Sequence, residues 1–317
     1  MKLIIQIPCL NEEASLASVL ESLPTQIGGV DQIERLVIDD GSTDRTVEVA
    51  RACGVEHIIS LGRRRGLAAA FMAGVDRALR EGADIIVNMD GDHQYDGADI
   101  PALVAPILEG RAQLVVGERP VRHIAHFSAA KKLLQHVGSA VVRLLSGVDV
   151  NDAPSGFRAI SADTALQLNV FSKYTYTLEM LIQAGGMGLA IDTAPVRVNP
   201  PTRPSRLASN MAVYLIRSAM TIVRMFIVYR PFRFFFFLGC APLLVGLALL
   251  AAGGFQPGWP PALALGAAAF AWGLAVLGDL IAINRRLLEA IRYRQRRDEL
   301  RAIRRRGARR SLEDEDA

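Results

Sequence analysis

Two carboxylates stand two residues apart, directly after a predicted buried strand. Asp90 and Asp92 follow residues 84–89, with Gly91 between them. Carboxylates at this spacing can face one hard cation, and oxygen ligands favour Mg²⁺ or Mn²⁺; protein-bound Mg²⁺ commonly also contacts substrate phosphates. The pair therefore indicates a divalent-metal site that handles a phosphate-bearing substrate. An acidic loop without a ligand is the alternative for the triplet taken alone.

Polar and acidic residues also follow the first two predicted strands, in residues 8–13 and 39–44. The carboxyl ends of parallel strands meet at one edge of a sheet, and ligands bind there. Three carboxylate clusters at one edge are unfavourable unless cations or hydrogen-bond donors compensate them. A nucleotide supplies such donors and a metal supplies charge. For Ser42 and Asp44, turn formation and helix capping are the alternative.

Arginines supply the positive counterpart to these carboxylates. Arg119 and Arg122 follow the fifth predicted strand, and Arg158 lies in the segment SGFR. Arg203 and Arg206 precede a predicted membrane segment. Guanidinium groups bind phosphate oxygens bidentately, so these arginines suit a lipid phosphate. Surface ion pairs are the alternative for Arg122 and Arg206.

Several other enzyme classes lack their motifs in this sequence. There is no GxxxxGK[ST] and no GxGxxG after a strand, which argues against a P-loop ATPase and a dinucleotide-binding enzyme, and the histidines form no HExxH arrangement. Three widely spaced cysteines, Cys9, Cys53 and Cys240, exclude a disulfide framework and suit a reducing compartment. No nucleic-acid partner is expected.

The elements that must position these residues alternate between strand and helix over residues 1–120. Short runs rich in Ile and Val predict strands, and amphipathic stretches between them predict helices. This alternation predicts an α/β fold: a mostly parallel, Rossmann-like sheet covered by helices on both faces. The predicted strands are 3–8, 36–39, 57–60, 84–89 and 112–117, and the predicted helices are 12–22, 43–53, 66–81 and 99–109.

The C-terminal third predicts a two-helix transmembrane hairpin. Residues 234–255 carry no charge, and residues 261–284 carry one, Asp279. Each is long enough to cross the hydrocarbon core, and the turn 256–260 joins them. Two buried helices of a soluble protein are the alternative. Arginines flank only the open side of the hairpin, at positions 230, 233, 285 and 286. The positive-inside rule then places both ends in the cytoplasm.

Two amphipathic stretches, 124–146 and 205–230, predict helices in the membrane interface, with ordinary surface helices as the alternative. Twelve arginines lie within residues 285–310, ahead of an acidic end. This tail is predicted either near anionic lipid headgroups or as a solvated helix. The first apolar run is too short for a signal peptide. The predicted domains are a cytoplasmic catalytic domain at 1–204, an interface helix at 205–230, the hairpin at 231–286 and the tail at 287–317.

The ordered motifs resemble family 2 glycosyltransferases of the polyprenyl-phosphate group, which is similar to dolichol-phosphate mannosyltransferases. The resemblance covers residue 3 to about residue 286, so the Arg-rich tail lies outside it. The motifs that carry it are IPCLNEE (7–13), VIDDGSTDRT (37–46), RGLAAAFMAG (65–74), NMDGDHQYD (88–96), VGERP (116–120), DAPSGFRAIS (152–161), RPSRL (203–207) and PFRFFFFLG (231–239).

The resemblance implies a GT-A catalytic domain that transfers one sugar, with inversion, from a UDP- or GDP-sugar to polyprenyl phosphate. The expected enzyme lies in the inner (cytoplasmic) membrane and uses Mg²⁺ or Mn²⁺. The resemblance also implies a homo-oligomer, with a tetramer as one form. The implied catalytic residues are Asp90, Asp92, Arg119, Asp152 (as an orienting group) and Arg158, and the metal residues are Asp90, Asp92 and Gln94. The implied nucleotide-sugar residues are Pro8, Leu10, Asn11, Glu12, Ile38, Asp39, Asp40, Met89, Asp90, Gly91, Asp92 and Gln94. The implied acceptor-phosphate residues are Arg119, Arg122, Lys131, Arg203 and Arg206.

The sequence departs from the family pattern at two places. Leu10 stands where an aromatic residue is frequent, which weakens expected base stacking. Residues 95–97 replace a frequent proline pair. The QxxRW motif of processive synthases is missing, since both tryptophans, Trp259 and Trp272, lie in or beside the hairpin. Polymer synthesis is therefore disfavoured.

Rival functions remain open from the sequence alone. A glycosyltransferase could act on diacylglycerol or a protein. A membrane-anchored nucleotidyltransferase shares the sheet and carboxylates but usually carries a Gly-rich basic loop near the first strand, where this chain has IPCLNEE. A membrane scaffold or transporter subunit is disfavoured because the polar residues concentrate at strand ends.

Overall fold

The computed structural model describes most of the chain and divides it into two units. The sheet unit is Met1–Met211 with Tyr293–Ala317, and the hairpin unit is Ala212–Arg292. The described residues are 1–120, 149–170, 176–200, 226–253 and 258–315, with isolated positions at 139, 140, 143, 147, 216, 219, 220, 223 and 224, and with side chains up to residue 302 in the last helix. Arg122, Lys131, Arg203, Arg206 and most of the stretches 124–146 and 205–225 lie outside them.

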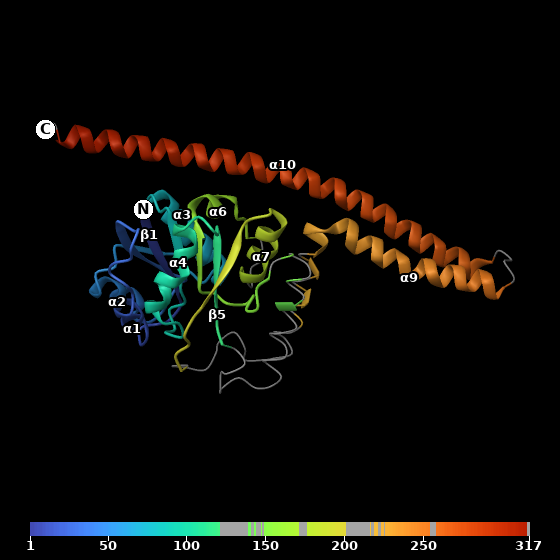
Figure 1. Cartoon of the computed structure of the whole chain (residues 1–317), viewed down its shortest axis with the longest axis horizontal. Coiled ribbons are helices and arrows are strands. Elements are labelled where there is room, and N and C mark those ends of the chain that lie inside the picture. Colours follow the sequence, from blue (N-terminus) through green and yellow to red (C-terminus); the bar gives the residue numbers. More distant parts are fainter. Residues whose placement is uncertain are drawn as a thin grey trace. The chain divides into compact units, whose positions relative to one another are not determined.

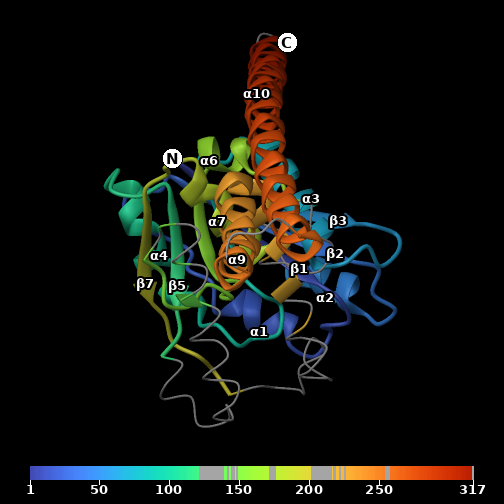
Figure 2. The ribbon, with the colours of Figure 1, turned by 90° about the vertical axis from the view of Figure 1, so that its right-hand side faces the viewer.

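The sheet unit contains one seven-stranded sheet in the order β3-β2-β1-β4-β6-β5-β7. All neighbouring strands are parallel except β6, which runs antiparallel to both β4 and β5. The five predicted strands are all present, so the mostly parallel sheet is confirmed (Figure 2). The strands are β1 Lys2–Cys9, β2 Gln32–Asp39, β3 His57–Ser60, β4 Ile85–Asn88, β5 Leu114–Glu118, β6 Arg158–Ser161 and β7 Ile191–Pro195.

Strands β6 and β7 were not predicted from the sequence. Strand β6 has only 4 residues, and it begins with Arg158, a charged residue that pairs with Asn88 of β4. Strand β7 has the sequence IDTAP, which is mostly half-buried and offers no apolar run. Hydrophobic periodicity cannot detect such strands, because tertiary pairing rather than local pattern creates them.

Helices cover both faces of the sheet, as predicted (Figure 1). Alternate β1 residues such as Leu3, Ile5 and Ile7 join a core with α1 (Leu16–Glu21), α2 (Thr46–Ala52) and α4 (Ile100–Leu108). The opposite face packs on α3 (Leu67–Arg80) and α6 (Ala162–Gln167). A β-carbon added at Gly74 of α3 would lie 2.4 Å from Gln6 Oε1. This glycine therefore allows α3 to approach β1. The remaining elements are the 3₁₀ helix η1 (Gly97–Asp99) and α7 (Thr177–Gly186).

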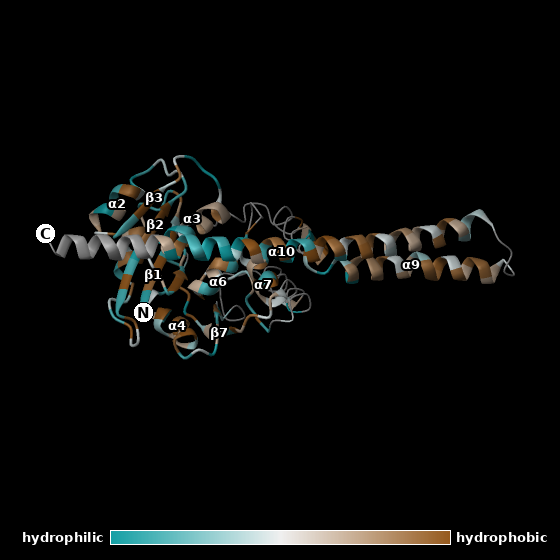
Figure 3. Cartoon of the chain, turned by 90° about the horizontal axis from the view of Figure 1, so that it is seen from above, coloured by the Kyte–Doolittle hydropathy of each residue, from teal (hydrophilic) through white to brown (hydrophobic). Residues whose placement is uncertain are grey.

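The hairpin unit contains two helices that are long and apolar enough to cross a membrane, α9 (Pro231–Ala252) and the first part of α10 (Trp259–Glu315). Both are coloured as mainly hydrophobic in Figure 3. Small residues let them approach closely. A β-carbon at Gly239 would lie 2.7 Å from Trp272 Nε1, and one at Gly278 would lie 2.7 Å from Pro231 Cβ.

Residues 287–317, which the sequence separates as a tail, continue α10 without a break to Glu315. Part of this helix contacts the sheet unit, to which it belongs. Tyr293 donates a hydrogen bond to Asp163 of α6, and Arg296 lies 3.5 Å from Asp76 of α3. Arg80 of α3 lies 3.5 Å from Glu299. The beginning of the tail is therefore held by protein contacts.

Gly239→Val is expected to destabilise the packing of α9 on α10. The added carbons collide with the Trp272 ring and with Ala268 O, which a β-carbon would approach to 3.2 Å. Overpacking of this kind costs about 1–3 kcal/mol. Thermal unfolding of the full chain in detergent, followed by tryptophan fluorescence, measures the effect. Gly266→Val is the matched control, because no atom lies within 4 Å of a β-carbon at Gly266. Equal melting of the two variants would contradict the packing described.

Candidate active site

The loops after β1, β2 and β4 meet at the carboxyl edge of three adjacent strands. The Asn11 amide donates to Ser42 Oγ at 2.9 Å, and the Thr43 amide donates to Asn11 Oδ1 at 2.8 Å, which joins the first two loops. Ser15 Oγ donates to Gly91 O at 2.8 Å, which joins the first loop to the third. The structure thus brings together the three polar clusters that the sequence singles out.

Asp39 and Asp40 shape the loop after β2. Asp39 Oδ1 accepts from the Ser42 amide at 2.7 Å. Asp40 accepts from the amides of Arg65 at 2.6 Å and Gly66 at 2.9 Å. Both carboxylates are buried. These bonds fix the segment 60–66 against the strand end, and the arrangement forms one wall of the site.

The contacts of Asp44 and Thr46 support the alternative given for this loop in the sequence analysis, in which its polar residues shape the turn before a helix. The Thr46 amide donates to Asp44 Oδ1 at 3.0 Å, and the Glu13 amide donates to Asp44 Oδ2 at 3.1 Å. Burial alone would raise the pKa of Asp44, but the hydrogen bonds from Thr46 and Glu13 lower it. Asp44 therefore serves the local structure before α2.

Asp90 and Asp92 lie on the loop after β4, as expected. Asp92 Oδ2 accepts from Gln94 Nε2 at 2.9 Å, and Asp92 Oδ1 accepts from the Gln94 amide at 3.2 Å. Burial and the neighbouring charge of Asp92 raise the pKa of Asp90 to about 7, although Arg119 opposes this shift. The two carboxylates therefore repel each other across a site that lacks full compensation from protein cations.

Such a pair fits a divalent cation completed by substrate. Among the residues that the structure describes, no group of three or more His, Cys, Asp and Glu could hold a metal ion. Mg²⁺ is commonly held by one or two carboxylates together with water and substrate phosphates. Asp90 and Asp92 meet that requirement, and a cation would offset both the burial and the Asp92 charge that raise the pKa of Asp90. Gln94 orients Asp92 through its side-chain amide.

Arg119 is held in place by Asp152. Arg119 Nε and Nη2 donate to the two oxygens of Asp152 at 2.6 and 2.9 Å. Asp152 is only 1% exposed and Arg119 keeps 14% of its side chain exposed, so the arginine is the partner that can reach a ligand. Burial alone would lower the pKa of Arg119, but the charges of Tyr95 and Asp152 raise it. Asp152 therefore fixes the position of the Arg119 guanidinium.

Arg158 lies beneath the site, where its guanidinium contacts backbone carbonyls. Its guanidinium donates to the carbonyls of Ser155 at 2.8 Å, Thr177 at 2.8 Å and Ala153 at 2.6 Å. The side chain is buried, and this burial lowers the pKa of Arg158 to about 10, so it stays charged near neutral pH. Arg158, for which the sequence predicts a catalytic role, thus holds the loop 153–157 through these contacts.

The residues predicted to bind the nucleotide-sugar differ in burial. Pro8, Ile38 and Met89 are buried, so they support the site from within the sheet. Leu10 and Asn11 are half-buried at the loop, and Asn11 adopts a left-handed conformation with φ 54°. Glu12 is 8% exposed and accepts from Ser15 Oγ at 3.2 Å. A β-carbon at Gly91 would lie 2.9 Å from Cys9 Sγ, so a larger residue there would force Cys9 or the loop to shift.

A buried polar cluster under Asp90 was missed from the sequence. Asn88 Nδ2 donates to Gly156 O at 2.9 Å and to the Tyr176 hydroxyl at 2.8 Å. The Tyr176 ring stacks on Phe71 of α3 with 4.0 Å between the ring centroids. The one available signal was an asparagine closing an otherwise apolar strand. The cluster fixes the loop that covers Asp90.

Gly156→Ala is expected to lower activity about tenfold with little loss of stability. A β-carbon at Gly156 would lie 3.0 Å from Asp90 Oδ2 and 3.1 Å from Oδ1, so the carboxylate must move. Initial rates at saturating donor measure the effect. Gly28→Ala is the matched control, because no atom lies within 4 Å of its added carbon. Full activity of Gly156→Ala would show that the position of Asp90 is not critical.

Asp90 should make the stability of the metal-free protein depend on pH. Its pKa is about 7 in the folded protein, whereas an unfolded aspartate has a pKa of about 3.9. The folded state thus holds a proton that the unfolded state has lost. This contribution is fully present below about pH 4 and is lost as the pH rises to about 7. Denaturant unfolding in EDTA should show the wild type losing stability relative to Asp90→Asn over this range. A constant difference would contradict the raised pKa.

The comparisons with known proteins agree with this geometry. The family model described as "Glycosyl transferase family 2" matches residues 4–163. An undecaprenyl-phosphate mannosyltransferase of Micrococcus luteus is 29% identical over 210 residues, which cover 62% of this chain and 83% of that protein. A polyprenol monophosphomannose synthase of Mycolicibacterium smegmatis is 28% identical over 229 residues, which cover 68% of this chain and 82% of that protein.

A solved structure shares the fold. Glucosyl-3-phosphoglycerate synthase from Mycobacterium tuberculosis, in complex with Mn²⁺, UDP-glucose and phosphoglyceric acid, has a TM-score of 0.56 and 27% identity. The similarity covers 70% of this chain and 79% of that chain. The GT-A-like α/β architecture is thereby confirmed. On the match over residues 4–163, the chain belongs to glycosyl transferase family 2, and its curated relatives align it with the polyprenyl-phosphate group.

Proposed function

We propose that this enzyme transfers a single sugar from a UDP- or GDP-sugar to polyprenyl phosphate at the cytoplasmic face of the membrane. The product is a polyprenyl-monophosphate sugar, formed with inversion at the anomeric carbon. The observation that carries the proposal is the Asp90–Asp92 pair on the loop after β4, at the edge where the strands end; burial and the charge of Asp92 together raise the pKa of Asp90 to about 7. Relatives named for polyprenyl-phosphate substrates support the choice of acceptor.

The donor half of the site uses the loops after β1, β2 and β4. Leu10, Asn11 and Glu12 are proposed to line the base and ribose pocket, with the wall that Asp39 and Asp40 hold together. Asp90 and Asp92, the latter oriented by Gln94, would hold Mg²⁺ or Mn²⁺. When bound, the cation offsets the negative charge that develops on the departing nucleoside diphosphate.

The part of the site that binds the acceptor needs an arginine to hold the phosphate, rather than a strong base to remove a proton. The second pKa of a phosphate monoester is about 6, so the acceptor is already largely a dianion at neutral pH. Both oxygens of Asp152 accept from Arg119, which agrees with a positioning role for that carboxylate. Arg119 would hold the acceptor phosphate in line with the sugar. Arg122, Lys131, Arg203 and Arg206 remain proposed contributors outside the described residues.

A cavity of about 370 Å³ at the ends of β5 and β7 supports this placement of Arg119. Its lining includes Arg197, which the sequence analysis did not single out. Arg197 Nε donates to Asp99 at 2.9 Å, which ties the segment after β7 to the start of α4. The cavity is an open space beside Arg119, and we assign it to the sugar or acceptor phosphate.

Membrane attachment would bring the catalytic residues to their lipid substrate. The apolar helix α9 and the apolar part of α10 support insertion. The arginines at the open side of the hairpin support a cytoplasmic location for the sheet unit and both termini. A homo-oligomer, including a tetramer, is retained as part of the proposal and rests on the family resemblance alone.

Competition between acceptors tests the proposal. The full chain is incubated with Mn²⁺ and radiolabelled UDP- and GDP-sugars, in the presence of polyprenyl phosphate, diacylglycerol or neither. We expect label in an acid-labile lipid only when polyprenyl phosphate is present. Label on diacylglycerol or on protein would support the rival acceptors, and transfer of the nucleotide itself would indicate a nucleotidyltransferase.

A further inference from the structure

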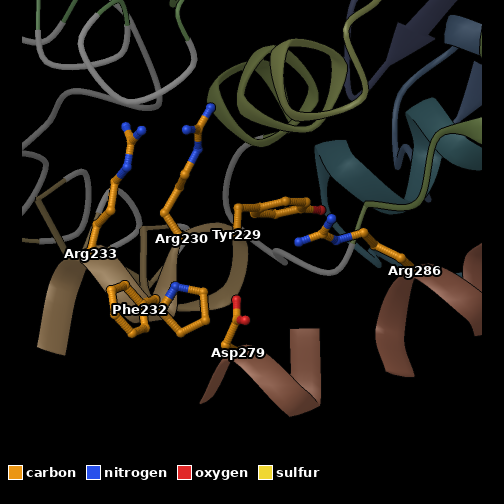
Figure 4. A pocket seen from close by; sticks show the side chains of 7 residues that line it. Tyr229, Arg230, Phe232, Arg233, Asp279 and Arg286 are labelled. Atoms are coloured by element: carbon orange, nitrogen blue, oxygen red, sulfur yellow. The ribbon is translucent and has the colours of Figure 1, made fainter. Parts of the chain in front are cut away.

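The hairpin unit contains a cavity of about 400 Å³ at the end where α9 begins. Three of its residues are arginines and one is an aspartate, so the lining carries a positive excess. Figure 4 shows Arg230 and Arg233 extending in the same direction from the start of α9, with Asp279 and Arg286 coming from α10. The lining residues are Tyr229, Arg230, Pro231, Phe232, Arg233, Asp279 and Arg286.

The cavity lies where α9 packs closely on α10. Pro231 is buried, and a β-carbon at Gly278 would lie 2.7 Å from Pro231 Cβ, so the first turn of α9 rests directly on α10. Next to the cavity, Arg285 stacks over the Tyr229 ring at 3.9 Å and donates to Glu289 at 2.9 Å. These contacts occupy Arg285. Its neighbour Arg286 is exposed and lines the cavity.

The cavity lies where the apolar parts of both helices end. In α9 the uncharged stretch begins at Phe234, directly after Arg233. In α10 the apolar stretch ends at Asn284, two residues before Arg286. A helix of about 20 apolar residues crosses the hydrocarbon core, so residues just beyond its end lie at the level of the lipid headgroups. Basic pockets between membrane helices on the cytoplasmic side bind anionic headgroups.

We propose that this cavity binds the phosphate group of an anionic glycerophospholipid. Guanidinium groups bind phosphate oxygens bidentately, and Phe232 adds an apolar surface beside the three arginines. The cavity, at about 400 Å³, is larger than a bare phosphate requires, which suits a glycerol-bearing headgroup. The proposal rests on the membrane location given under the proposed function, and it is independent of sugar transfer.

Native mass spectrometry of the full chain, delipidated in a neutral detergent, measures binding of phosphatidylglycerol. We expect one saturable site. Arg230→Gln and Arg286→Gln should each weaken binding about tenfold, as expected for loss of one charge-assisted contact. Asp279→Asn should tighten binding, because it removes the opposing charge. Arg292→Gln is the matched control, an exposed arginine of α10 outside the cavity, and should change affinity less than about twofold.

Parallel titrations distinguish the possible ligands. Equal binding of phosphatidylcholine, or unchanged binding by Arg230→Gln and Arg286→Gln, would overturn the site. If the chain bound inorganic phosphate but no phospholipid, the proposal that the phosphate belongs to a lipid would be overturned. Arginine-dependent binding of polyprenyl phosphate alone would overturn the phospholipid assignment. Sugar transfer, assayed in the same preparations, separates the two proposals: a chain that binds phosphatidylglycerol but transfers no sugar refutes the function and leaves this site standing.

Discussion

Asp92→Asn is expected to lower sugar transfer at least about a hundredfold, which is typical when a group that stabilises transition-state charge is removed. Asparagine keeps the size of the side chain but loses one of the two charges that would hold the cation. The variant should fold normally, because the Asp92 contacts to Gln94 lie on a half-buried loop. Initial rates with saturating Mn²⁺ and thermal melting of the same sample measure the two effects.

Asp76→Asn provides the control for this loss. Asp76 lies on α3, where it pairs with Arg80 at 2.9 Å and lies 3.5 Å from Arg296, away from the loops that form the site. It should keep near-normal activity. If Asp92→Asn also kept near-normal activity, and EDTA left the wild type unaffected, the divalent cation would have no place in the mechanism.

Arg158→Leu is expected to lower the free energy of unfolding of the sheet unit by about 3 kcal/mol or more. The substitution removes three hydrogen bonds from a buried guanidinium and leaves the carbonyls of Ala153, Ser155 and Thr177 without those donors. Each buried carbonyl that is left without a hydrogen-bond partner lowers the free energy of unfolding further. Denaturant unfolding of the full chain in detergent, followed by circular dichroism, measures the change.

Arg77→Leu gives a surface comparison for the same chemical change. Arg77 pairs with Glu81 at 2.7 Å, and its side chain is 46% exposed, so its loss should cost no more than about 1 kcal/mol. Arg158→Lys should recover part of the stability, because it restores the charge with fewer donors. Equal midpoints for Arg158→Leu and Arg77→Leu would contradict the structural role assigned to Arg158.

The first half of the fold could be predicted because its signals are local. The runs before Cys9, Asp39 and Asn88 are short and apolar, and they end in turn residues, so they mark buried parallel strands. Strands β6 and β7 escaped because they lack such runs. The length of α10 was also not predicted. The charge content suggested that a separate tail begins at residue 287, whereas the helix continues through that position.

The place of the carboxylate pair in the fold could be predicted, but the contacts of individual side chains could not. The spacing of Asp90 and Asp92 after a strand placed the carboxylate pair correctly on the loop after β4. Residue type alone could not show that Arg119 pairs with Asp152, since the two are 33 residues apart in sequence. Nor could it separate Arg119, which is partly exposed, from the buried Arg158. Those distinctions depend on burial and partners that only tertiary structure provides.

The most direct test of the account is the identity of both products formed by the wild type with Mn²⁺, a nucleotide-sugar and polyprenyl phosphate. Mass spectrometry should find polyprenyl phosphate enlarged by one sugar residue and an equal amount of nucleoside diphosphate, with neither formed in EDTA. Pyrophosphate release, a chain of several sugars on the lipid, or undiminished products in EDTA would contradict it.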